Sequence, residues 1–150
     1  MSAAESAIEH TGQIAKLPAA AALVALVGLA DSIYLTVHHF TTEPVPCSII
    51  SGCETVLTSS YAEIAGIPLA ALGAAAYFAA FSFALLAAFG NRFMWTLFGI
   101  QSIVMAGFTA WLIYLQAVVI GAFCQFCLLS ALTSLTLLIL FLSSVVTSRK

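Results

Sequence analysis

The chain has little charge. Four Lys and Arg and six Asp and Glu make up 7% of its 150 residues, and the formal net charge is −2. No basic cluster occurs, so the composition argues against a nucleic-acid-binding protein and against a patch for lipid headgroups. Apolar residues reach 63%, with a mean hydropathy of +1.13, whereas a soluble domain holds roughly 45 to 50%. This composition predicts an integral membrane protein.

Polar interruptions are few, and they divide the sequence into four long apolar segments. A helix needs about 20 residues to cross the roughly 30 Å core of a bilayer. Pro18 and Pro68 stand where a first helical turn tolerates proline, and residues 116–123 are expected to form a short apolar turn. We find no repeat and no second domain. We therefore predict an all-α bundle of four transmembrane helices at 17–40, 68–89, 93–115 and 124–146.

Three segments lie outside these predicted helices. Residues 1–16 and 148–150 are expected to be short polar tails without a fold of their own. Residues 41–67 form a loop that contains no Lys or Arg. Within this loop, residues 53–57 and 61–64 alternate apolar and polar side chains at roughly helical spacing, which favours a short helical turn on the bundle mouth.

The few cations report the topology. With four spans, all of them fall on one side of the membrane, which the positive-inside rule makes cytoplasmic. Both termini are then cytoplasmic, while the loop 41–67 and the start of the fourth helix share the exoplasmic face. We expect a bacterial inner membrane protein with its cysteines facing the periplasm, where disulfides persist. The cations are Lys16, Arg92, Arg149 and Lys150.

A competing interpretation makes the first apolar segment a cleaved signal peptide. Lys16 would be its basic region, residues 17–29 its hydrophobic region and residues 28–30 its small-residue cleavage site. The apolar run continues to Val37, so we favour a retained transmembrane helix.

The four cysteines form two pairs with different surroundings. Cys47 and Cys53 are six residues apart in the loop, and Cys124 and Cys127 form a C-x-x-C motif where the last helix begins. On a helix, residues three apart share a face, with Cys127 about 4.5 Å deeper in the membrane. The positive end of the helix dipole favours the reactive thiolate there.

This arrangement suits an electron relay. Thiol-disulfide exchange passes electrons between pairs through mixed disulfides, and here one pair faces water while the other faces lipid. We infer a path from a water-soluble dithiol to a lipid-soluble acceptor such as a quinone. Two alternatives remain open, namely a zinc site and two fixed structural disulfides. The loop pair is wider than a usual zinc knuckle and has no neighbouring His in sequence, so we expect no metal.

The sequence resembles the vitamin K epoxide reductases and their bacterial homologues over about residues 17–147. That family consists of membrane oxidoreductases with a four-helix bundle. The resemblance is carried by the four cysteines and by residues 28–35, residues 58–62, residues 66–68, Gly73 and Tyr77.

The resemblance implies roles for individual residues. Cys127 would reduce a quinone bound at the exoplasmic end of the bundle, and Cys124 would be its disulfide partner. Cys53 would exchange with a thioredoxin-fold protein, after which Cys47 would attack Cys124. Ser59 matches a loop serine near the active site of the family.

Two departures from the family's vertebrate members concern the substrate. Those members carry an Asn and a Tyr that engage the vitamin K head group, at positions that here look like Leu69 and Ala131. This difference favours ubiquinone or menaquinone as the cofactor, with vitamin K quinone or epoxide reduction as the alternative.

Many bacterial members carry a fused thioredoxin-like domain that does not follow Lys150, so the partner is expected to be a separate periplasmic thioredoxin-fold oxidase. A further alternative is a second family of bacterial membrane thiol oxidases. That family places its C-x-x-C motif in the first outer loop, the reverse of the cysteine order in this chain, which argues against the assignment.

Three further residues are of interest. Phe108 and Trp111 share a face of the third predicted helix and are possible quinone-lining residues, although an aromatic stripe also suits packing or the membrane interface. Asp31 lies within the first predicted helix, where an ionisable group is a functional candidate by default. We expect it to form hydrogen bonds inside the bundle near Ser32 and Tyr34.

Overall fold

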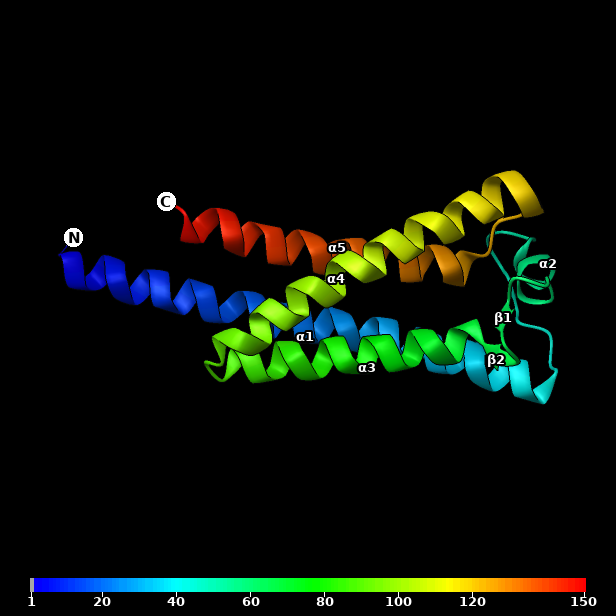
Figure 1. Cartoon of the computed structure of the whole chain (residues 1–150), viewed down its shortest axis with the longest axis horizontal. Helices are drawn as coiled ribbons and strands as arrows, with labels where there is room; N and C mark the ends of the chain where they lie inside the picture. Colours follow the sequence, from blue (N-terminus) through cyan, green and yellow to red (C-terminus); the bar gives the residue numbers. More distant parts are fainter. Residues whose placement is uncertain (1) are drawn as a thin grey trace.

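The computed structural model describes residues 2–150, apart from the side chains of residues 6–11, 13 and 14. The chain is an elongated bundle, in which a small loop structure closes one end and both termini lie at the other (Figure 1). Four stretches of the described residues are long and apolar enough to cross a membrane, in agreement with the predicted four-helix bundle. The long helices are α1 (Ala3–Thr41), α3 (Leu69–Ala88), α4 (Arg92–Tyr114) and α5 (Gln125–Ser148).

Small residues let these helices approach closely. α1 packs extensively against α3 and also against α5, while α4 packs against both α3 and α5. At the contact of α1 with α3, a Cβ on Gly28 would overlap the ring of Tyr77. Lipid supplies no hydrophobic drive between helices, so close backbone contact of this kind is the main source of packing energy. The core of the bundle centres on Tyr77, Phe98 and Leu137.

The first helix begins earlier than predicted. The sequence indicated a start near residue 17 with Pro18 in the first turn, whereas α1 begins at Ala3 and contains Pro18 in its interior. Ser2 and Glu5 form a capping box: the Glu5 N–H donates to the Ser2 hydroxyl, and the Ser2 N–H donates to the Glu5 carboxylate. The expectation that residues 1–16 have no fold was therefore wrong for this helical part.

The loop between α1 and α3 contains one predicted helical turn and one structure that was not predicted. α2 (Cys53–Leu57) is the expected turn. Residues 61–64 are not helical, because β1 (Glu63–Ile64) pairs antiparallel with β2 (Ile67–Pro68). Ala65 and Gly66 between them have φ of 53° and 79°, and two successive positive φ values are typical of a tight hairpin turn.

The connection from α4 to α5 is longer and more regular than the predicted turn. The helix continues past Tyr114 as the π-helix η1 (Leu115–Ile120), which ends at Gly121 in the left-handed region with φ of 70°. No helix-breaking residue occurs before that glycine, so the apolar helix extends up to it. The chain then returns in extended conformation to Cys124, the residue that caps α5.

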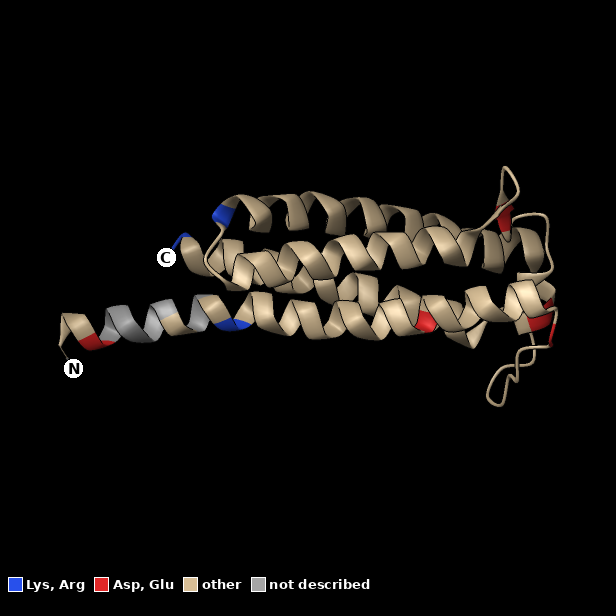
Figure 2. Cartoon of the chain, turned by 90° about the horizontal axis from the view of Figure 1, so that it is seen from below, with Lys and Arg blue, Asp and Glu red and all other residues tan. Residues whose placement is uncertain are grey.

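Charge is segregated along the bundle. Figure 2 shows Lys and Arg only at the end where both termini lie, while acidic residues of the loop lie at the opposite end. This matches the distribution read from the sequence. Which end faces the cytoplasm stays a prediction.

Candidate active site

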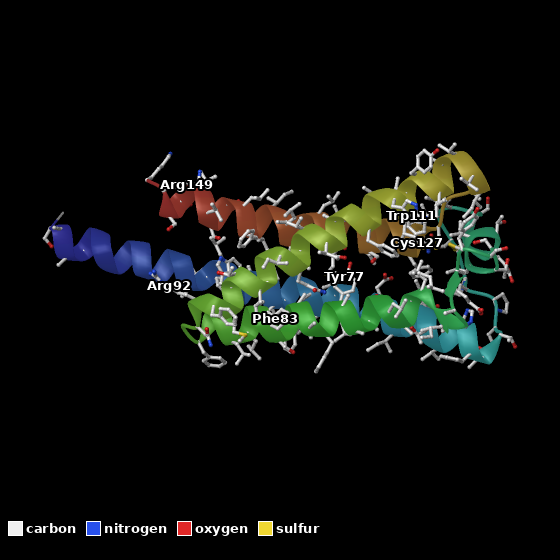
Figure 3. The ribbon with its side chains drawn as sticks, in the orientation of Figure 1. Tyr77, Phe83, Arg92, Trp111, Cys127 and Arg149 are labelled. Carbon is white, nitrogen blue, oxygen red and sulfur yellow. A yellow bond between two sulfur atoms is a disulfide. The ribbon has the colours of Figure 1, made fainter. Side chains whose placement is uncertain are left out.

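The structure brings all four cysteines into one cluster beneath the loop. Cys47 and Cys53 form a disulfide, and Cys124 and Cys127 are free. Cys53 and Cys124 are 1% and 0% exposed and belong to the same buried cluster, against which Cys47 and Cys127 pack. Figure 3 shows Cys127 near the loop-bearing end, far from Arg92 and Arg149. Two pairs that are 71 residues apart in sequence, counted from Cys53 to Cys124, are thus packed together.

Two contacts hold the loop against the start of α5. The backbone N–H of Ile49 donates a hydrogen bond of 3.0 Å to the side-chain oxygen of Gln125. Gly52 lies against the backbone of Phe123, and a Cβ there would collide with the Phe123 carbonyl oxygen and amide nitrogen. Glycine at this position therefore lets α2 and its cysteine lie directly on the C-x-x-C segment.

Gln116 orients the C-x-x-C motif from the other side. Its side chain is buried in η1, and its Oε1 accepts a hydrogen bond of 3.1 Å from the backbone N–H of Cys124. The same side chain also interacts with the thiol of Cys127. Sequence reasoning did not find this residue. Its signal was a single polar side chain within the apolar stretch that precedes the motif.

Cys124 has the electrostatics of a reactive thiol. It caps α5 immediately before the membrane-spanning segment Gln125–Ser148. Its pKa is lowered to about 7, first because the Cys127 side chain donates a hydrogen bond to its sulfur, and also because the backbone N–H groups of Cys127 and Phe126 do so. Burial and the charge of Asp31 act in the opposite direction. The pair can therefore hold a thiolate at the helix N-terminus near neutral pH.

A cavity of about 890 Å³ adjoins this cluster between the helices. This volume lies within the range of sites for cofactors and drug-sized ligands. Cys127 lines the cavity, while Cys124 is not among the lining residues of the described chain. Because the deeper sulfur borders the cavity and the other touches the loop pair, the C-x-x-C motif connects the two regions.

The predicted quinone-lining residues separate in the structure. Phe108 and Ser59 line the cavity, and the Ser59 hydroxyl donates a hydrogen bond of 2.7 Å to the Val56 carbonyl at the end of α2. Trp111 does not line it. Its ring is 45% exposed and packs beside Phe108 with a centroid distance of 5.4 Å. Three helical residues turn about 300°, so the two rings point about 60° apart, and only Phe108 faces the cavity.

A protein-family model described as the vitamin K epoxide reductase family matches residues 19–142. The match covers most of the chain, including all four cysteines and the cavity wall. The chain belongs to this family. The resemblance seen in the sequence is therefore confirmed, and the protein is a membrane thiol oxidoreductase of the quinone-reducing type in general terms.

The positions at which this family member departs from the vertebrate pattern both lie at the cavity. Leu69, at the start of α3, and Ala131, one turn after Cys127, line its wall. Neither side chain can form a hydrogen bond.

A cluster of hydroxyl groups beside the cavity was also missed. The Tyr77 hydroxyl lies 2.7 Å from both the Ser130 carbonyl and the Thr133 hydroxyl. It also lies 2.9 Å from the hydroxyls of Ser130 and Ser134. The spacing 130, 133 and 134 places these hydroxyls on one face of α5, which was the signal in the sequence. Figure 3 places Tyr77 deeper in the bundle than Cys127.

Asp31 does not have the environment that the sequence suggested. We expected hydrogen bonds near Ser32 and Tyr34. Its carboxyl group is 7% exposed and borders the cavity, and neither oxygen has a hydrogen-bond partner among the described residues. The adjacent Ser32 side chain lies instead toward Gly73 of α3.

Proposed function

We propose that this protein oxidises a thioredoxin-fold dithiol through Cys47 and Cys53 and passes the electrons through Cys124 and Cys127 to a membrane quinone. Two electrons enter as a thiol of the partner opens the loop disulfide. They move on when a loop thiolate attacks a Cys124–Cys127 disulfide, and they leave when the reduced C-x-x-C pair converts quinone to quinol. The result is net formation of one disulfide in the partner.

The single observation that carries this proposal is the position of Cys127. It packs against the cluster that contains the loop disulfide, and it also lines an apolar cavity large enough for a quinone head group. A thiol that contacts both the loop cysteines and the cavity can receive electrons from the loop pair and pass them to a quinone in the cavity.

This geometry favours a relay over two fixed disulfides. Two fixed staples give no reason for Cys127 to line a cavity, whereas a relay to a small acceptor requires that position. It also disfavours the zinc alternative, since two of the four sulfurs are bonded to each other.

The order of exchange within the loop pair is part of the proposal. We assign Cys53 to the outside partner and Cys47 to the attack on Cys124. Because Cys53 is 1% exposed, the assignment requires α2 to move away from η1 when a partner binds. The Cys47→Ser protein should then hold a mixed disulfide through Cys53, and the Cys53→Ser protein should not. Mass spectrometry of the trapped complex identifies the bonded cysteine, and trapping through Cys47 alone would reverse the assignment.

We propose ubiquinone or menaquinone as the acceptor. The support is the absence of a hydrogen-bonding side chain at Leu69 and Ala131, where vitamin K recognition in the vertebrate enzymes relies on polar groups. We further propose a periplasmic position for the cysteines, with the cationic end in the cytoplasm. A separate thioredoxin-fold oxidase is the proposed partner.

The deciding experiment is an assay of the purified protein with a reduced thioredoxin-fold substrate. Ubiquinone, menaquinone, vitamin K quinone and vitamin K epoxide are offered in turn, and quinone loss is followed by absorbance. We expect turnover with ubiquinone or menaquinone, and none with the Cys127→Ala protein. The matched control is Ser143→Ala, an exposed side chain far along α5, which should behave as wild type. Normal quinone-dependent thiol oxidation by Cys127→Ala would refute the relay.

A further inference from the structure

Asp31 is a buried acid that the relay described so far does not use. It lies in α1 at 7% exposure, and both of its oxygens lack a hydrogen-bond partner in the part of the chain that the structure describes. A carboxylate in such a position is costly unless it is paired or neutralised. Among the described residues, no Lys or Arg lines the cavity to pair with it, because the cations lie at the other end of the bundle (Figure 2).

The packing of α1 on α3 holds this carboxyl group at the cavity wall. One turn before Asp31, Gly28 leaves no room for a Cβ beside Tyr77. One residue after it, the Ser32 hydroxyl lies 3.2 Å from where a Cβ on Gly73 would stand. The two helices are therefore in close contact around Asp31, and its side chain cannot withdraw between them.

Asp31 and the redox-active thiols border the same space. Asp31 and Cys127 both line the cavity, and Asp31 lies close enough to the C-x-x-C pair to interact electrostatically with both thiols whenever it is ionised. The wall also contains Glu43, Glu54 and Tyr61, and His38, whose Nδ1 lies 3.4 Å from the Glu43 carbonyl oxygen. Two further groups of the wall already have close partners. His39 is paired with Glu63 at 2.9 Å, and the Tyr77 hydroxyl is surrounded by four oxygen atoms of α5.

We propose that Asp31 is protonated in the resting protein, donates a hydrogen bond to one oxygen of the quinone in this cavity, and gives its proton to that oxygen during reduction. This inference rests on the proposed quinone reduction. It names the residue that supplies the polar contact which Leu69 and Ala131 cannot make.

The reaction balances without another reactant. Starting from two thiols, formation of the Cys124–Cys127 disulfide releases two electrons and two protons, and conversion of quinone to quinol consumes both. The first quinone oxygen takes the proton of Asp31. The resulting Asp31 carboxylate is then reprotonated by one of the two protons from the thiols. The second proton from the thiols accounts for the other quinol hydroxyl. Proton transfer by a positioned acid contributes typically 10² to 10⁴-fold to a rate.

The test compares two substitutions that separate proton transfer from packing. Asp31→Asn keeps the shape and a hydrogen-bond donor but cannot transfer a proton. Asp31→Glu keeps the acid but adds a methylene group to a closely packed site. A proton donor requires kcat for quinone reduction to fall at least about tenfold in Asp31→Asn, with an almost unchanged KM for quinone, and to be higher in Asp31→Glu. A merely structural role gives the reverse order, because the asparagine fits better.

Two controls make each outcome decisive. Reduction of the Cys47–Cys53 disulfide by dithiothreitol, read by thiol alkylation, should be unchanged in Asp31→Asn and shows that the variant is folded. Ser102→Ala removes a buried hydroxyl of α4 whose residue is not among those lining the cavity, and its kcat should equal that of wild type. Suppose that wild type reduces quinone and that Asp31→Asn keeps the full kcat or has a higher kcat than Asp31→Glu. The proposed role of Asp31 is then refuted, while the proposed function stands. If wild type reduces no quinone, the proposed function fails, and the role of Asp31 fails with it.

Discussion

The side-chain oxygen of Gln116 accepts a hydrogen bond from the backbone N–H of Cys124 at 3.1 Å. This bond joins η1 to the first residue of the C-x-x-C motif across an extended connection. The backbone N–H groups at the start of a helix lack acceptors within the helix. Gln116 provides the acceptor for the N–H of the capping residue, Cys124. Gln116 is therefore a positioning residue for the thiol pair.

Loss of this bond should weaken both the fold and the reaction. Gln116→Ala leaves the buried N–H of Cys124 without an acceptor, which costs about 1 to 3 kcal/mol. We expect a lower unfolding temperature in detergent and a slower quinone reduction. Gln116→Met keeps a side chain of similar length without an acceptor and should also lose stability, which separates the hydrogen bond from the packing. Equal stability of Gln116→Ala and wild type would show that the bond is dispensable.

The lowered pKa of Cys124 predicts how its reactivity changes with pH. The thiolate fraction rises as the pH passes through the pKa, so alkylation of the reduced pair should accelerate with a midpoint near pH 7, whereas a free cysteine has its midpoint near 8.5. In Cys127→Ala the main stabilising hydrogen bond is lost, and the midpoint should move upward. Iodoacetamide labelling followed by mass spectrometry measures both. Because Cys47 and Cys53 are bonded to each other, they do not interfere.

The four spans, and the separation of both cysteine pairs from the cations along the bundle, were predictable from the sequence, for a simple reason. Apolar runs longer than about 20 residues have few structural solutions in lipid, and an odd number of crossings separates the loop 41–67 and Cys124 from every cation. The tight β-hairpin and the π-helical end of α4 were not predictable in this way. They depend on local backbone choices at Gly66 and Gly121 that produce no change in hydropathy.

Side-chain direction was the hardest feature to predict. Phe108 and Trp111 are three residues apart, and a rotation of α4 by some tens of degrees decides which of them faces the cavity. The close approach of α1 and α3 one turn before Asp31 likewise depends on the contact of Gly28 with Tyr77, two residues 49 positions apart. Periodicity identifies the face of a helix, but it does not identify the partner helix or the rotation between the two.

Gln125 should control access to the loop disulfide. Its side chain accepts the Ile49 N–H at 3.0 Å, and this bond is exposed, so its removal should change the free energy of unfolding by no more than about 1 kcal/mol. We expect Gln125→Ala to loosen the loop and to accelerate reduction of Cys47–Cys53 by dithiothreitol. The rate is measured by quenched thiol alkylation. Gln125→Glu, which retains the acceptor, is the matched control, and an unchanged rate in the alanine variant would show that other contacts hold the loop.

Two glycines offer a direct test of the helix packing that places Asp31 at the cavity. A Cβ on Gly28 would overlap the Tyr77 ring, while nothing lies within 4 Å of the Cβ position of Gly107. Gly28→Ala should therefore cost about 1 to 3 kcal/mol through overpacking, and Gly107→Ala should be neutral or stabilise α4 by roughly 0.5 to 1 kcal/mol. Thermal unfolding in detergent compares them. Since Gly28 lies one turn from Asp31, its alanine variant should also slow quinone reduction, whereas equal stability and turnover of the two variants would mean that α1 and α3 are not in close contact there.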